Sequence, residues 1–391
     1  MRWRYRETVL ALCTLAFLVT MMGRLAISPV IPEIVETFAV SNAVVGLSLT
    51  GMWLAYGLSQ YPSGVLADRY GERSIILVAV GGSALAALAV SITPAFALFF
   101  LATILLGAVA GLHYSVATTL LARTYDGNVG AAIGVHNSGA TVAGLVTPVA
   151  VAWLAIHFGW RVAVAAVAVV GIPATVLFAW KVRPTEPRRP ETPLRDRFQV
   201  SVVRDLLSRP AVAFTLVIAI IGEFAWQGTA SFLPTFLIEH HEASTTLAGT
   251  LFSVYFVVQG VAQVGVGAVS DRFGRDRALA GCMFAGVVGF GLLVTASGLP
   301  AIVVSVAFVG VAMSFGSALM PRFLNAFSDE EQNAGFGLVR TVYMIVASLG
   351  SVVVGLLADL FGWAVAFGFL GAALAAVAIA IVINGALELG Y

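Results

Sequence analysis

Charge is scarce in this 391-residue sequence: 10% of its residues are Asp, Glu, Lys or Arg, against about 25% in soluble globular chains. The sequence is 60% hydrophobic, and its mean hydropathy is +0.97. The net charge is only +1, so no overall basic field exists that would attract a nucleic acid. This composition excludes a soluble enzyme, a disordered regulator and a nucleic-acid-binding protein.

Residues that build disulfides, metal sites and catalytic sites are also few. The two cysteines, Cys13 and Cys282, lie in apolar segments and predict neither a disulfide framework nor a thiolate metal site. Residues 239–242 (Glu-His-His-Glu) are expected in an outer loop, as a solvated loop or as a weak metal patch. The sequence contains no Walker A motif and no convergent nucleophile–base pair. We therefore expect no cofactor, no resident metal and no enzymatic activity.

Long apolar runs are what the sequence has in abundance. A helix of about 20 apolar residues crosses the ~30 Å hydrocarbon layer of a bilayer. The first run, too long for a signal peptide, is expected to be an uncleaved span. Ten or eleven spans are the alternative to twelve, because two connections carry weak turn signals. We predict an all-α polytopic membrane protein with spans at 8–31, 42–66, 75–93, 96–121, 129–156, 160–181, 211–238, 245–269, 278–297, 300–322, 333–358 and 362–386.

One long polar stretch, residues 183–209, divides the chain. Its prolines and charges oppose both helix formation and burial in lipid. Nearly all of the 21 basic residues then fall on one side of the membrane, which by the positive-inside rule places both termini in the cytoplasm. We predict a monomeric plasma-membrane protein of a prokaryote with a six-helix bundle over 1–181, a cytoplasmic linker over 182–209 and a second six-helix bundle over 210–391.

The two halves are related by an internal repeat with a constant offset of 203 residues. Asp68 matches Asp271 at this offset, and the tripeptide Phe-Gly-Trp at 158–160 returns at 361–363. Six is an even number of spans, so both halves have the same orientation. The repeat predicts a pseudo-twofold axis along the membrane normal and a binding site near the midplane.

A charged loop follows the second span and is echoed after the eighth. The sequence reads GVLADRYGER at 64–73 and GAVSDRFGRDR at 267–277. We expect Gly64 to let helices approach closely and Gly71 to adopt a positive φ, while each aspartate caps a helix or pairs with an arginine. Such a pair can latch one conformation. The residues predicted to act in conformational switching are Gly64, Asp68, Arg69, Gly71, Arg73, Gly267, Asp271, Arg272 and Gly274.

Together with the spans and the repeat, this motif resembles the loop 2–3 signature of the major facilitator superfamily of secondary transporters. The resemblance covers the whole chain and implies two six-helix bundles that give alternating access to a central cavity, lined by spans one, four, seven and ten. Two departures weaken a drug/proton antiporter interpretation. Span four carries Thr103 where related proton-driven members often carry arginine, and span five, at 139–148, lacks a clean antiporter signature.

Polar residues inside the spans are the candidate site residues, because an ionisable side chain there costs about 2.5–3.5 kcal/mol on insertion scales. Glu223 lies near the expected middle of span seven, Trp226 follows closely, and Gln227 is one turn further on the same face. The resemblance implies that Arg24, His113 and Glu223 lie on cavity helices. The candidates for substrate contact are Arg24, His113, Tyr114, Asn137, Glu223, Trp226, Gln227, Arg340 and Tyr343, with Glu223 also the candidate for proton coupling.

Each ionisable candidate also has a structural alternative. Glu223 either exchanges a proton or bridges to Arg24. Arg24 and Arg340 either contact a solute or a gate, or extend to the lipid headgroups. His113 is either sensitive to protons or a hydrogen-bonded packing residue.

Two arginines inside the membrane suit an anionic solute, because a guanidinium can bind a carboxylate through two hydrogen bonds. We therefore expect a permease for a small organic anion or carboxylate, with proton symport through Glu223. The alternatives are an efflux permease for an amphipathic drug or metabolite, and a nutrient sensor built on a transporter fold.

Overall fold

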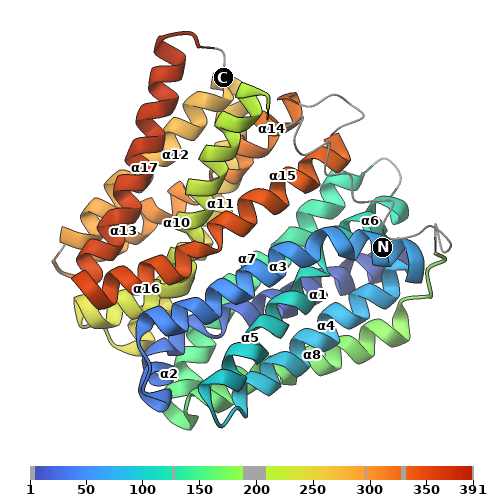
Figure 1. The fold of residues 1–391 in the computed structure, drawn as a ribbon. Helices are drawn as coiled ribbons and strands as arrows, with labels where there is room; N and C mark the ends of the chain where they lie inside the picture. Colours follow the sequence, from blue (N-terminus) through green and yellow to red (C-terminus); the bar gives the residue numbers. More distant parts are fainter. Residues whose placement is uncertain (1–4, 126–127, 188–207, 296, 327–331, 390–391) are drawn as a thin grey trace. The chain divides into compact units, whose positions relative to one another are not determined.

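The computed structural model describes residues 5–125, 128–187, 208–295, 297–326 and 332–389. All regular elements in these ranges are helices, as a lipid environment demands of the backbone. The chain forms two compact units, one made of residues 1–40 and 48–198 and the other of residues 41–47 and 199–391. Each unit is a bundle of helices (Figure 1). Most of the predicted linker, residues 188–207, lies outside the described residues.

The helices of the first half begin and end close to the predicted spans. They are α1 (Tyr5–Leu25), η1 (Ser28–Val30), α2 (Ile31–Phe38), α3 (Asn42–Tyr70), α4 (Glu72–Ser91), α5 (Phe96–Gly111), α6 (Tyr114–Thr124), α7 (Val129–Phe158) and α8 (Trp160–Lys181).

The second half repeats this order. Its helices are α10 (Pro210–His241), α11 (Thr245–Phe273), α12 (Arg275–Thr295), α13 (Leu299–Ala312), α14 (Gly316–Ala326), α15 (Gln332–Ala347), α16 (Leu349–Phe361) and α17 (Trp363–Ala386).

Eleven helical segments of the described chain are long and apolar enough to cross a membrane. The remaining predicted span is α3, which is not among these eleven but whose 29 residues extend about 43 Å at 1.5 Å per residue. The predicted first span, 8–31, continues to Phe38 and is interrupted, because Pro29 and Pro32 lack backbone N–H groups. The twelve predicted spans are therefore helical, with the first boundary corrected and with short breaks at 112–113 in the fourth span, 313–315 in the tenth and 348 in the eleventh.

The internal repeat is visible in helix packing and in backbone conformation. In the first half α4 packs on α5 and α8, and in the second α12 packs on α13 and α17. Gly71 and Gly274 have φ of 81° and 97°, and Gly159 and Gly362 have φ of 80° and 84°. Only glycine adopts such angles readily, so the prediction of a positive φ at Gly71 is confirmed and holds for its repeat partner.

Close helix packing involves other glycines than we predicted. A Cβ atom added at Gly64 would meet no described atom within 4 Å, so the prediction of close approach at Gly64 is wrong, and its repeat partner Gly267 is equally open. A Cβ at Gly107 of α5 would instead overlap the carbonyl oxygen of Met52 in α3. The backbones of α5 and α3 therefore touch at Gly107.

We expect Gly107→Ala to destabilise the protein by about 1–3 kcal/mol, because the added methyl group meets backbone that cannot turn away as a side chain can. The matched control is Gly134→Ala in α7, where the methyl group has open space and alanine favours the helix by about 1 kcal/mol. Thermal unfolding of the purified protein should show a lower Tm for the first variant only. Equal Tm values for the two variants would contradict this packing.

Candidate functional site

Arg24 lies in the last turn of α1, directly before the break in the first span. Its side chain is only 4% exposed. The guanidinium lies over the ring of Tyr56 at 4.1 Å and near that of Trp53 at 5.3 Å, and both rings belong to α3. Its Nε donates a hydrogen bond of 3.2 Å to the carbonyl oxygen of Thr20. Arg24 is thus held inside the first unit by an aromatic clasp, here defined as Tyr56 and Trp53, and does not extend to a lipid headgroup.

Two buried histidines of the first unit lie next to each other. His113 lies in the break between α5 and α6, and His136 lies on α7. Phe17 of α1 stacks on both imidazoles, with ring centroids 5.6 Å and 4.9 Å away and interplanar angles of 22° and 21°. The two imidazole centroids are 5.3 Å apart. Tyr114 completes the cluster, with its ring 5.5 Å from Phe17.

The ring nitrogens of both histidines are buried, and their hydrogen bonding is unusual. The backbone of Cys13 lies near both rings. None of the four ring nitrogens forms a hydrogen bond of ordinary length and angle within the described residues. Buried polar groups in proteins are nearly always paired, so this pair stays a candidate for proton sensing, while the nearby backbone of Cys13 fits the packing alternative. The sequence prediction named Asn137, which is exposed, and the buried residue is its neighbour His136.

Glu223 of α10 is the acidic candidate of the second unit. Arg340 of α15 and the buried Tyr255 of α11 both interact electrostatically with Glu223. The charge that acts on Glu223 within its own unit therefore belongs to Arg340. The hydroxyl of Tyr255 forms no hydrogen bond with a described residue, and the same is true of both amide atoms of the fully buried Gln227.

Trp226 and Tyr343 are the remaining candidates. Trp226 is half-buried beside Gln227. Tyr343 is buried and stacks on Phe323, with centroids 6.3 Å apart and an interplanar angle of 11°. Tyr255 was missed at the sequence level, because an aromatic residue in an apolar span gives no signal until its neighbours are known.

The first charged loop is fastened to the end of α8 and the residues that follow it. The guanidinium of Arg73 donates to the carbonyl oxygens of Val182 at 2.7 Å and Ala179 at 2.6 Å. The backbone N–H of Arg73 donates to the hydroxyl of Thr185 at 3.0 Å. A Cβ at Gly71 would overlap the carbonyl of Thr185. Arg73 thus caps the C-terminal end of α8, as cations near helix C-termini do.

An ion pair between a buried glutamate and a partly exposed arginine adds to this anchorage. The carboxylate of Glu72, 3% exposed, accepts a hydrogen bond of 2.6 Å from Arg123 at the end of α6. Asp68 is half-buried, and Arg69 is exposed with its guanidinium 5.5 Å from the centroid of the Tyr70 ring. In the second loop Asp271, Arg272 and Gly274 are exposed. The two loops share their backbone turn and differ in their contacts.

Residues 239–242 are neither a solvated loop nor a metal patch. Residues 239–241 belong to the last turn of α10, which ends at His241. The ring nitrogens of His240 and His241 bond to the carbonyl oxygens of Val294 and Leu293, and Glu239 accepts a hydrogen bond from Trp363 at 2.7 Å. Among the described residues, no group of three or more His, Cys, Asp or Glu side chains is arranged to hold a metal ion.

Comparison with known proteins decides the family. Residues 13–244 and 215–384 match the sequence model of the Major Facilitator Superfamily. The chain belongs to the Major Facilitator Superfamily. It is accordingly a multi-pass membrane protein of a transporter family, and this family and its fold are not those of enzymes.

Relatives in this superfamily are similar at low identity. The gallate transporter of Pseudomonas putida is 25% identical over 426 residues, which cover 97% of this chain and 92% of the relative. The hexuronate transporter of Bacillus subtilis is 22% identical, covering 73% and 72%. The membrane sensor protein UhpC of Escherichia coli is 23% identical over 184 residues, 46% of this chain, and the match spans only 42% of the sensor's length.

Solved structures of the superfamily share the fold. The nucleoside transporter NupG superposes with a TM-score of 0.83 at 13% identity, covering 97% of this chain and 99% of NupG. A bacterial homologue of the human lysosomal transporter Spinster, in an inward-facing and unoccupied conformation, gives a TM-score of 0.78 at 19% identity, covering 99% and 96%. These identities support the fold of two six-helix bundles and no finer similarity.

We expect Arg73→Gln to loosen residues 179–186, because the amide cannot replace both carbonyl contacts of the guanidinium. Hydrogen exchange of a peptide covering these residues should become about tenfold faster, which corresponds to about 1.4 kcal/mol. Arg69→Gln is the matched control, since it removes the same charge from an exposed side chain of the same loop. Unchanged exchange in Arg73→Gln would show that the cap does not restrain this segment.

Proposed function

We propose that this protein is a secondary transporter that moves a small organic anion by alternating access, together with a proton carried on Glu223. The observation that carries the proposal is the electrostatic interaction of Glu223 with Arg340 inside the second unit. We further propose that the linker and both charged loops face the cytoplasm, as the distribution of basic residues predicts.

Arg24 supplies one attractive charge. Tyr56, Trp53, the carbonyl oxygen of Thr20 and the sulfur of Met21 are among its contacts, and these four groups are neutral. They orient the guanidinium. A cation held in this way over aromatic rings is stabilised by about 2 kcal/mol when desolvated, and a guanidinium is well suited to bind a carboxylate.

Arg340 links anion binding to protonation. The negative charge of Glu223 and the positive charge of Arg340 attract each other. When Glu223 takes up a proton, its carboxyl becomes neutral and this attraction is lost. A solute carboxylate then interacts more favourably with the guanidinium of Arg340, so the protonated protein binds the anion more tightly. A proton and an anion then cross the membrane together, which is symport.

The names of the relatives support the same solute class. Two relatives, matched over 97% and 73% of this chain, are named for transport of carboxylates, gallate and hexuronate. Gallate and glucuronate, a hexuronate, are therefore the first solutes to test. The sensor alternative is favoured by the match to UhpC, and the efflux alternative has no comparable observation in its favour. Flux of a solute into proteoliposomes distinguishes a transporter from a sensor.

We expect Glu223→Gln to abolish accumulation of gallate or glucuronate driven by a pH gradient, because the amide cannot carry a proton through the cycle. Counterflow should persist, since it needs no net proton movement. Both activities are measured in proteoliposomes. The matched control is Glu239→Gln, at the end of the same helix, where the amide oxygen can still accept from Trp363. Proton-driven accumulation by Glu223→Gln would refute coupling through this residue.

We expect Arg24→Lys to weaken solute binding by about 10-fold to 150-fold, the equivalent of one charged hydrogen bond at about 1.5–3 kcal/mol. Lysine keeps the charge but loses the planar fork that binds a carboxylate and stacks on Tyr56. Arg161→Lys is the matched control, because Arg161 also lies over an aromatic ring, 4.5 Å from the centroid of Trp160. The measurement is the Kd of the solute that the wild type transports, and an unchanged Kd in Arg24→Lys would exclude an anion site at Arg24.

A further inference from the structure

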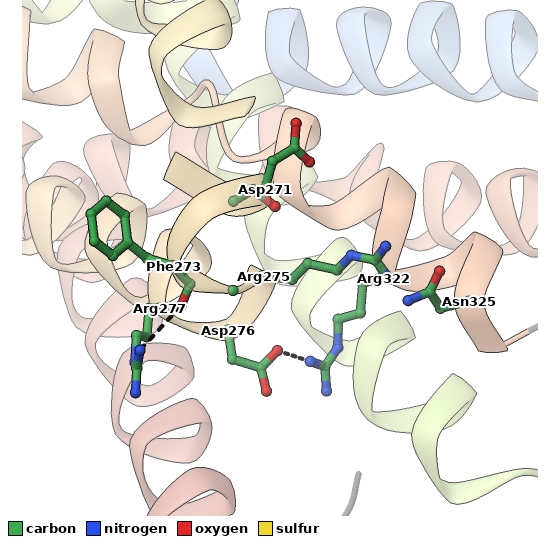
Figure 2. A pocket seen from close by; sticks show the side chains of 9 residues that line it. Asp271, Phe273, Arg275, Asp276, Arg277, Arg322 and Asn325 are labelled. Atoms are coloured by element: carbon green, nitrogen blue, oxygen red, sulfur yellow. Dashed lines mark hydrogen bonds and ion pairs between the residues drawn. The ribbon is translucent and has the colours of Figure 1, made fainter. Parts of the chain in front are cut away.

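A charged hollow of about 650 Å³ opens on the second unit, where α11 ends, α12 begins and α14 passes (Figure 2). We call it the arginine hollow. Arg322, one of its residues, is the penultimate residue of an apolar span that ends at Phe323, so the hollow lies where the protein leaves the hydrocarbon layer. The residues that matter for its chemistry are Ser270, Arg275, Asp276, Arg277, Arg322 and Asn325.

Positive charge is in excess in the arginine hollow. Arg322 forms an ion pair with Asp276, and its Nε donates to the hydroxyl of Thr215 at 2.9 Å. Arg275 also acts electrostatically on Arg322, as a repelling charge. Figure 2 shows Arg275 extending toward Asn325, while the carboxylate of Asp271 points away from the pair of Arg322 and Asp276. Two guanidiniums that face one hollow favour an anion between them.

Two further groups point to an anion with several acceptor oxygens. Ser270 is only 4% exposed, lines the hollow, and its hydroxyl has no hydrogen-bond partner among the described residues. The helix α12, 21 residues long, begins at Arg275, so the N–H groups of its first turn and the positive end of its dipole face this place. Helix N-termini that accompany arginines commonly hold phosphate.

The corresponding place in the first unit is closed by the chain itself. Glu72 stands there at the repeat position of Arg275 and is paired with Arg123. The space beside Gly71 is filled by Thr185, whereas nothing described lies within 4 Å of a Cβ at Gly274. The repeat therefore does not require a hollow or an excess of arginine, and both are particular to the second unit.

We propose that the arginine hollow binds a phosphate group, presented by the headgroup of an anionic phospholipid or as free phosphate. The guanidiniums of Arg275 and Arg322, the hydroxyl of Ser270 and the N-terminal N–H groups of α12 are its donors. Tetrahedral phosphate oxygens accept hydrogen bonds from several directions, which matches donors that come from three helices. This site is separate from Glu223 and Arg24 and does not depend on the transported solute.

Two binding measurements on the full-length protein distinguish the sources. Native mass spectrometry of the delipidated protein compares retention of phosphatidylglycerol with that of a neutral galactolipid, which has no phosphate. Titration with inorganic phosphate, followed by phosphorus-31 line broadening, tests the free anion. Preferential retention of phosphatidylglycerol identifies the headgroup, and saturable binding of inorganic phosphate identifies the free anion. Either result supports the site.

The variants separate a built site from general attraction between charges. Arg275→Gln should weaken binding about tenfold or more, the usual effect of losing one charged contact. Ser270→Ala should weaken it without any change in net charge. Arg272→Gln is the matched control, because this exposed arginine lies in the same loop but outside the hollow. Thermal unfolding verifies that each variant is folded.

Two results would overturn the proposal. Failure of both phosphatidylglycerol and phosphate to bind the wild type would show that acidic residues of the chain balance these arginines. An equal loss in Arg272→Gln and Arg275→Gln, with none in Ser270→Ala, would show that only bulk charge is sensed.

Discussion

A backbone in hydrocarbon finds no water to hydrogen-bond with, and most of this structure follows from that constraint. The described elements are helices for this reason, and each interruption of a helix leaves polar groups that side chains must satisfy. Arg24 bonds to the carbonyl of Thr20 next to the break in the first span. Gln259 donates to the carbonyl of Met313 at 2.9 Å, where α13 gives way to α14. Polar residues therefore collect where helices break, and three of the candidate site residues, Arg24, His113 and Tyr114, lie at such breaks.

Which residues lie inside long apolar helices could be predicted from the sequence, but the direction of a side chain around its helix could not. Hydropathy placed Arg24 and Glu223 inside such helices, and the charged-loop motif predicted the positive φ of Gly71. The apolar spans are hydrophobic on every side, so nothing in the pattern indicated that Arg24 faces Tyr56 or that Glu223 lies near Arg340. The mistaken role for Gly64 has the same origin, because a glycine allows close packing only on the face that meets another helix. The end of α10 was predicted too early, because two histidines and two glutamates at 239–242 are typical of a polar loop. In the structure His241 bonds to α12 and Glu239 to α17.

The polar groups of the two units fall into different chemical types. The first unit contributes a cation held over aromatic rings and a pair of imidazoles packed on Phe17. The second contributes a carboxyl, a guanidinium and an amide. In the proposed transport cycle the fixed charge of the first unit attracts the anion, and the titratable carboxyl of the second couples its movement to the proton gradient. A transporter that accumulates an anion needs both, since attraction alone would bind the solute without releasing it.

The glycines shared by the two halves show which parts of a duplicated sequence are free to diverge. Gly71 and Gly274 have kept one backbone conformation, since any other residue would strain the turn. The next position carries no such constraint, and it holds an acid, Glu72, in one copy and a base, Arg275, in the other. One ancestral turn has thus acquired opposite charges in its two descendants. Selection on such a protein is expected to preserve the turn in both copies and to alter the charge of each copy independently, so that either loop can change its partner without cost to the fold.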